Sequence, residues 1–139
     1  MKRTPQRLKR RREFLHVARA GRKWAAAGLV LQAVDRHGGR ETAAREEAGA
    51  DNIRIGFTVT RRVGGAVVRN RARRRLRAAA ETVMPRHAAG GYDYVLIGRA
   101  GTLRRPFPAL VGDLETALRK LGAWQDTARG AGGEERDKA

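Results

Sequence analysis

The chain has 139 residues and no cysteine, and its 31 lysine and arginine residues against 14 acids give a formal net charge of +17. Hydrophobic residues make up 41% of the chain and aromatic residues 5%, so we expect one domain with a modest, mostly aliphatic core. The charge predicts a polyanionic partner, nucleic acid ahead of an anionic membrane, and the missing cysteine excludes disulfides, thiolate metal sites and cysteine nucleophiles.

The N-terminal segment is basic and leads into a short helix. We expect residues 1–7 to be a disordered arm that orders on RNA, with a merely soluble tail as the alternative. The helix is predicted over residues 11–20, because Phe14, Val17 and Ala18 share one face and a glycine follows as a stop. The pattern alone makes Phe14 a core candidate.

Two strands and a long loop follow. Residues 22–26 are a candidate short strand, and residues 28–34 alternate in the way of a clearer one. Residues 35–52 have no usable period and hold five of the 14 acids. They are therefore predicted to be a solvent-exposed loop between antiparallel strands, pointing away from RNA.

The strongest pattern is a strand followed by a basic helix. Apolar residues alternate with small or polar ones over residues 53–62, which predicts the strand. Gly64 and Gly65 break that period. A helix with an apolar stripe is predicted over residues 66–84, and Pro85 is expected to end it.

The polar half of this helix is dominated by arginine. Arg69, Arg73 and Arg77 lie four residues apart, a spacing at which like charges destabilise an isolated helix. No acid occurs over residues 54–77. We interpret the face as a phosphate-binding surface, because arginine suits bidentate phosphate recognition; an ordinary solvated face is the alternative. Arg75 lies near the apolar edge and is predicted to snorkel out along it.

The C-terminal third predicts a strand, a helix and a tail. Residues 92–99 are almost continuously apolar, as in a central strand covered on both sides. With the preceding strand and helix they form a β-α-β crossover, expected to be right-handed on general grounds. Residues 101–105 add two arginines, and a helix is predicted to start near Pro106 and to end by Leu121. Residues 123–139 are predicted to be a disordered tail.

The sequence carries no sign of its own catalytic centre. Nine of the 14 acids lie within residues 35–52 or after residue 122, and the other five are spread over four elements. The three histidines have no metal-ligand spacing, and no glycine-rich nucleotide-binding motif occurs. No apolar run is long enough to span a membrane, and the basic N-terminus lacks the apolar stretch of a secretory signal, so we expect a cytoplasmic protein.

The strand, glycine turn and arginine helix together resemble the signature of the protein subunit of bacterial ribonuclease P. That signature reads R-[IV]-G-[FL]-[ST]-V-[ST], followed by V-G-x-A-V-x-R-N-R-x-[RK]-R-x-x-R. Here residues 54–60 read RIGFTVT and residues 63–77 read VGGAVVRNRARRRLR. The resemblance extends over residues 8–121. Its specificity comes from the ordered combination, since an Arg-Asn-Arg triplet alone would carry no weight.

The resemblance implies an α+β fold of order α-β-β-β-α-β-α, a two-layer sandwich of a mixed sheet and helices with a left-handed β-α-β crossover, in a domain over residues 8–122. It also implies an endoribonuclease holoenzyme whose RNA subunit performs the hydrolysis, with Mg²⁺ held mainly by RNA. The protein would bind that RNA subunit and the 5′ leader of precursor tRNA. Neither a membrane nor an obligate protein partner is implied.

Two sets of site residues follow from the resemblance. The set that would bind phosphates of the RNA subunit is Arg69, Asn70, Arg71, Arg73, Arg74 and Arg77. Within it, Asn70 would help to position a magnesium ion through hydration water. The set that would form a cleft for the leader is Phe14, Val17, Val30, Gln32, Thr58, Thr60, Arg61 and Arg62. Ala18 and Gln32 stand where the family often has aromatic residues, which removes rings for base stacking.

Two other classes of protein fit part of the pattern. A small ribosomal RNA-binding protein would use a basic β-α-β fold structurally, without a leader cleft. A bacterial DNA-compacting protein fits the charge alone. Neither class predicts the strand-turn-helix signature, so that signature favours the ribonuclease P hypothesis over both alternatives.

Overall fold

The protein is organised around one mixed sheet. The structure, a computed structural model, describes residues 5–36 and 52–125. Its strands are β1 (Gln6–Arg7), β2 (Arg22–Ala25), β3 (Leu29–Asp35), β4 (Arg54–Val59) and β5 (Tyr92–Gly98). They lie in the order β1-β4-β5-β3-β2. The β1-β4 and β4-β5 pairs are parallel, and the β5-β3 and β3-β2 pairs are antiparallel.

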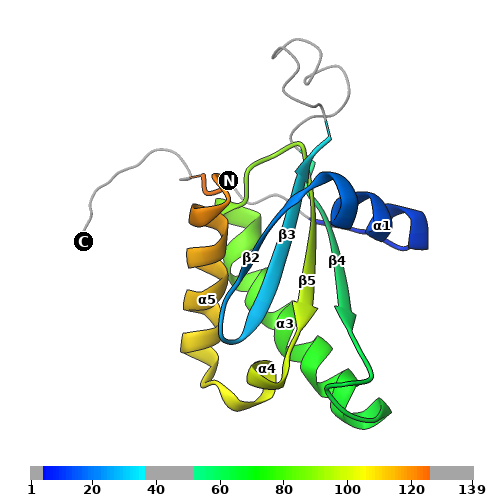
Figure 1. Cartoon of the computed structure of the whole chain (residues 1–139). Coiled ribbons are helices and arrows are strands. Elements are labelled where there is room, and N and C mark those ends of the chain that lie inside the picture. The colour runs from blue at the N-terminus through cyan, green and yellow to red at the C-terminus, as the bar shows by residue number, and fades with distance from the viewer. Residues whose placement is uncertain (1–4, 37–51, 126–139) are drawn as a thin grey trace.

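Two helices, α3 (Ala66–His87) and α5 (Phe107–Lys120), cover one face of this sheet (Figure 1). The main core lies between them and the sheet, where Leu31 and Leu96 of the strands meet Leu76 and Leu114 of the helices. All four side chains are fully buried. Four successive residues of β5 are buried, which confirms the prediction of a central strand covered on both sides.

Helix α1 (Arg11–Ala20) covers only part of the opposite face, well apart from α3 and α5 (Figure 1). Here Val17 packs with Leu8 and Val95 in a second, smaller core, and Phe14 lies against it. The face is therefore closed where α1 crosses it and less completely covered beyond the helix.

The predicted α+β class and mixed sheet are confirmed, with two elements that the sequence did not predict. The first is β1. The backbone N–H groups of Gln6 and Leu8 donate to the carbonyls of Ile53 and Ile55 at 2.9 and 3.0 Å. A two-residue strand carries no periodicity, so assigning Gln6 and Arg7 to the disordered arm was wrong. Residues 1–4 lie outside the described residues.

The second unpredicted element is α4 (Ala100–Arg104), in a segment for which the sequence predicted no helix. Its first turn is closed by Thr102, whose Oγ1 accepts a hydrogen bond from the Arg99 N–H at 2.9 Å. The same hydroxyl donates to the carbonyl of Gly28 at 2.6 Å, in a fully buried position. Helix α4 therefore forms because it closes over the β2-β3 turn, a tertiary contact that local pattern does not reveal.

The end of α3 and the start of the tail also differ from expectation. Pro85 does not end α3, which continues to His87. Val83, Met84 and Pro85 are all buried, so packing outweighs the one backbone hydrogen bond that proline removes. Trp124, placed in the disordered tail, instead forms a β-bridge with Ala88 and stacks on His87 with the ring centroids 4.2 Å apart.

Strand β2 is an edge of the sheet, and all four of its residues are exposed. The rest of the predicted tail, residues 126–139, and most of the predicted loop, residues 37–51, lie outside the described residues. Within residues 5–36 and 52–125, no helix is long and apolar enough to cross a membrane. The handedness of the β4-α3-β5 crossover stays a prediction.

Candidate nucleic-acid interface

The face of the sheet beside α1 carries most of the residues predicted to form a leader cleft. Val30 pairs with Ile97, and Ile97 pairs with Thr58, so these three side chains form one row across β3, β5 and β4. The next row toward α1 is Gln32, Val95 and Gly56 by the same pairing. The sheet register thus brings together residues that are far apart in sequence.

Phe14 sits directly over Gly56 of β4. A Cβ atom added at Gly56 would lie 2.5 Å from Cε2 and 2.6 Å from Cζ of the Phe14 ring. Only a residue without a side chain lets the ring approach the backbone this closely. The half-buried ring therefore has one edge on the sheet and stands at the border between α1 and the row of Val30, Ile97 and Thr58.

The eight predicted leader residues do not all lie on this surface. Val17 is fully buried, so the prediction that it contacts RNA is wrong; it holds α1 on the sheet instead. Val30, Gln32 and Thr58 are half-buried. Thr60, Arg61 and Arg62 are exposed at the turn that follows β4. The turn is closed by the Val63 N–H donating to the Thr60 carbonyl at 3.1 Å.

The predicted RNA-binding residues of α3 are all at the surface, but they differ in exposure and in local contacts. Asn70, Arg71 and Arg74 are exposed, whereas Arg69, Arg73 and Arg77 are half-buried. Arg69 Nε donates to the carbonyl of Gly64 at 3.2 Å, and Arg73 Nη1 donates to Asn70 Oδ1 at 2.8 Å. The Nε of Arg77 is buried without a hydrogen-bond partner in the described part of the chain.

Arg75 marks the limit of this surface. Its Nε donates to the carbonyl of Thr102 at 2.8 Å, and its Nη2 donates to the carbonyl of Arg105. The predicted snorkelling is therefore wrong: Arg75 is tied to the backbone of α4. Arg71 precedes it by one helical turn and lies on the same flank, whereas Arg69, Arg73 and Arg77 share a stripe that Arg75 does not join.

The five arginines among the predicted RNA-binding residues of α3 have no acidic partner within the described residues. The ion pairs among the described residues join Arg36 and Arg54 to Asp93, Arg54 to Glu13, and Arg105 to Asp113. None of them involves the arginines of α3. A stripe of cations without acidic partners is the electrostatic arrangement that favours a phosphate backbone.

Arg54, the first residue of the RIGFTVT motif, forms a network that the sequence did not reveal. Its Nε and Nη2 donate to Asp93 Oδ1 and Oδ2 at 2.8 and 2.6 Å, and its Nη1 donates to Glu13 Oε2 at 3.2 Å. Asp93 raises the pKa of Arg54, chiefly by accepting these hydrogen bonds. Asp93 is 3% exposed, whereas the Arg54 side chain is 32% exposed, so the pair lies at the edge of the interior beside the first turn of α1.

Glu13 caps α1 as well as pairing with Arg54. Its Oε1 accepts hydrogen bonds from the backbone N–H groups of Arg10 and Lys9 at 3.0 and 3.1 Å. These two bonds, followed by the charge of Arg54, hold the pKa of Glu13 below its ordinary value. The carboxylate is therefore ionised at neutral pH and fixes the start of the helix that carries Phe14.

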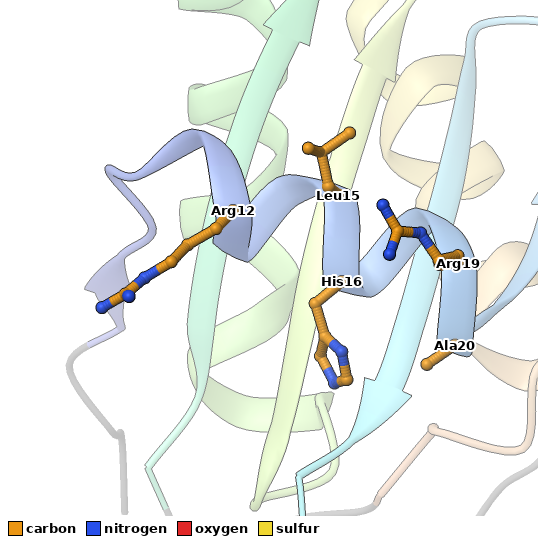
Figure 2. A pocket seen from close by; sticks show the side chains of 5 residues that line it. All are labelled: Arg12, Leu15, His16, Arg19 and Ala20. Carbon is orange, nitrogen blue, oxygen red and sulfur yellow. The ribbon is translucent and has the colours of Figure 1, made fainter.

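A separate hollow lies on α1 itself. It has a volume of about 300 Å³ and is lined by Arg12, Leu15, His16, Arg19 and Ala20, all from this helix (Figure 2). None of the predicted leader residues lines it, so it is distinct from the surface beside Phe14. No group of three or more histidine, aspartate or glutamate side chains placed to hold a metal occurs within residues 5–36 and 52–125.

Gly56, Arg54 and Glu13 are the site residues that sequence reasoning missed. A glycine in the middle of a strand signals a close approach by another group, and that signal was present at Gly56. Arg54 was recognised as part of the motif, but its partners depend on the register of β4 and β5 and on where α1 crosses them.

Comparison with known proteins gives consistent results. A family model described as Ribonuclease P matches residues 1–122. The ribonuclease P protein component of Paramagnetospirillum magneticum is 52% identical over 121 residues, covering 87% of this chain and 86% of the relative. That of Gluconacetobacter diazotrophicus is 55% identical over 116 residues, covering 84% and 90%.

Two solved structures have the same fold. The RNase P protein of Staphylococcus aureus matches with a TM-score of 0.67 at 20% identity, covering 88% of this chain and all of that one. The RNase P protein of Thermotoga maritima matches with a TM-score of 0.62 at 25% identity, covering 84% of this chain and 94% of that one.

Proposed function

The chain belongs to the ribonuclease P protein family, and from that premise we propose that its α3 face binds the catalytic RNA subunit while the sheet face beside α1 holds the 5′ leader of precursor tRNA. The protein is a component of ribonuclease P, an RNA-binding subunit of a tRNA-processing nuclease. A ribosomal or DNA-compacting role does not account for a family match over residues 1–122.

The charge of α3 supports its assignment to the RNA subunit. Arg69, Arg73 and Arg77 form one stripe, and none of them is paired with an acid among the described residues. Phosphate groups would offset the repulsion within the stripe. The RNA subunit performs the hydrolysis, with Mg²⁺ held mainly by RNA.

Asn70 contributes at most an orienting contact to such an ion. Its Oδ1 already accepts a hydrogen bond from Arg73 at 2.8 Å, which leaves one lone pair for a hydration water of the ion. The same contact holds the Arg73 guanidinium against the helix surface, where it meets a phosphate without further loss of side-chain freedom.

The position of Phe14 carries the proposal for the leader. Its ring stands on Gly56 at the border of α1, beside the row of Val30, Ile97 and Thr58. An unpaired base stacks on the exposed side of such a ring, while the backbone of the leader runs toward Arg61 and Arg62 at the exposed turn. Mature tRNA lacks the leader, so this contact favours precursor over product.

Reconstitution tests the proposal. At low magnesium concentration, we expect the purified protein to restore cleavage of precursor tRNA at the mature 5′ end by a ribonuclease P RNA. The protein alone, free of RNA, should cleave nothing. The reconstituted enzyme should bind precursor more tightly than mature tRNA, and Phe14→Ala should reduce that preference. Equal loss for both substrates would remove Phe14 from the leader site, and cleavage by RNA-free protein would refute the division of labour.

A further inference from the structure

Helix α1 is fastened to the sheet at two places. The first is apolar, where the fully buried Val17 packs with Leu8 and Val95. The second is ionic, where Arg54 reaches Glu13 in the first turn of α1. A single apolar contact lets a helix rock about it, whereas a second fixed point one turn away sets its angle.

The ionic attachment is rigid because the arginine itself is anchored. Two of its nitrogens bind both oxygens of Asp93 at 2.6 and 2.8 Å, a bidentate arrangement that fixes the plane of the guanidinium. Asp93 is in turn held by Arg36 Nη1, which donates to Asp93 Oδ1 at 3.0 Å. The remaining nitrogen of Arg54, Nη1, is therefore held in one position, from which it donates to Glu13.

The ion pair between Arg54 and Glu13 lies beside the place where the Phe14 ring contacts Gly56. Phe14 directly follows Glu13 on α1, and Gly56 lies two residues beyond Arg54 on the same side of β4. Moving the first turn of α1 therefore moves the ring across Gly56. If the Phe14 ring no longer rests on Gly56, it either covers the row of Val30, Ile97 and Thr58 or moves away from that row.

We propose that Arg54, held by Asp93 and acting through Glu13, is a positioning residue that sets the place of Phe14 and thereby the preference of the enzyme for precursor over mature tRNA. This inference rests on the proposed leader site. Arg54 does not itself reach the leader, because its three donor nitrogens are engaged with carboxylates.

The chemistry of the network fits positioning better than simple stabilisation. Apolar residues of similar size often stabilise a fold as well as a buried ion pair does, because removing charges from water is costly. A network of fixed hydrogen bonds instead specifies one arrangement of the groups it joins. Here the groups joined are β4, β5 and the one helix that carries the proposed stacking ring.

Glu13→Gln is the sharpest test, because glutamine keeps a side-chain oxygen for the cap at Lys9 and Arg10 but removes the charge that attracts Arg54. Glu115→Gln, on α5, makes the same change in net charge away from α1 and is the matched control. Both variants are reconstituted with the RNA subunit, and their affinities for precursor and mature tRNA are measured together with thermal melting.

We expect Glu13→Gln to lower the ratio of the two affinities by about 2- to 30-fold, the range found for residues that act through a neighbour. Affinity for the RNA subunit should not change, and Glu115→Gln should leave the ratio unchanged. In a Phe14→Ala background, Glu13→Gln should lower the ratio no further, since the group through which it acts is gone.

Three results would overturn the inference. An unchanged ratio for Glu13→Gln, with a lowered ratio for Phe14→Ala, would leave the leader site standing but deny the positioning role. A fall of equal size in both backgrounds would mean that Glu13 does not act through Phe14. No effect of Phe14→Ala on the ratio would remove the leader site and the inference together. Arg54→Lys keeps the positive charge but loses the bidentate guanidinium. The same comparison, made with and without Phe14→Ala, tests the positioning role from the Arg54 side of the pair.

Discussion

Gly56→Ala should displace Phe14 without altering either the ring or the charge of the protein. The added methyl group would lie 2.5 and 2.6 Å from two ring carbons and 3.2 Å from Cβ of Leu8. Carbon atoms prefer separations of about 3.5–4.0 Å, so the ring has to move by about 1 Å and Leu8 by a few tenths of an ångström. Overpacking of this kind costs about 1–3 kcal/mol.

Thermal melting and tRNA binding measure the two consequences. A loss of 1–3 kcal/mol lowers the melting temperature by about 4–12 °C in a domain of this size, at about 4 °C per kcal/mol. The ratio of affinities for precursor and mature tRNA should fall toward that of Phe14→Ala. In the double variant Gly56→Ala with Phe14→Ala, the methyl group has room, so the stability cost of Gly56→Ala should largely disappear.

Gly112→Ala is the matched control. Gly112 lies within α5, and a Cβ atom there would have no heavy atom within 4 Å. Replacing a helical glycine by alanine should therefore raise stability by about 0.5–1 kcal/mol and leave tRNA binding unchanged. If Gly56→Ala behaved in the same way, the ring would not rest on Gly56, and the account of the leader surface would be refuted.

Three further predictions concern the charged residues. Arg69→Ala with Arg73→Ala should flatten the slope of log K against log salt for RNA-subunit binding by roughly 1.5–2, and an unchanged slope would mean that this stripe is merely solvated. Arg75→Ala should cost about 2 kcal/mol in thermal unfolding by freeing two backbone carbonyls, with no change in the salt slope; a flatter slope with normal melting would place Arg75 on RNA instead. Because the folded-state pKa of Glu13 is lowered, its contribution to stability is fully present above the ordinary value of 4.5 and is lost as pH falls from there through the lowered folded-state pKa. The melting-temperature difference between wild type and Glu13→Gln should therefore shrink through that acid range, and a constant difference would deny the carboxylate this role.

Periodicity was enough to predict the large elements of the fold. The alternation over residues 53–62 and the stripe over residues 66–84 correspond to β4 and α3, because their apolar side chains face one continuous core. Periodicity did not predict the elements whose stability comes from tertiary contacts. Strand β1 depends on two backbone hydrogen bonds to residues 53 and 55, and α4 depends on Thr102 reaching the carbonyl of Gly28.

The candidate site was predictable in composition but not in geometry. The arginines of α3 could be found as a run without acids, yet only the structure separates Arg75, bound to backbone carbonyls of residues 102 and 105, from the arginines proposed to bind RNA. Val17 and Phe14 share one helical face in the sequence, but the sheet buries one and leaves the other at a border. The partners of Arg54 depend on strand register, which a single sequence does not specify.

The exposed edge strand β2 has a consequence for handling the protein. Because β2 is an edge strand of the described sheet, a strand of another copy can add to its outer side, and Arg22 and Lys23 stand on that strand as two cations. Positive charge on both copies opposes such pairing at low ionic strength. Concentrated salt, the usual means of stripping RNA from a basic protein, weakens this repulsion as it weakens RNA binding. The protein should therefore be most prone to self-association at the moment it is freed from RNA, and a short polyanion should keep it dispersed better than salt does.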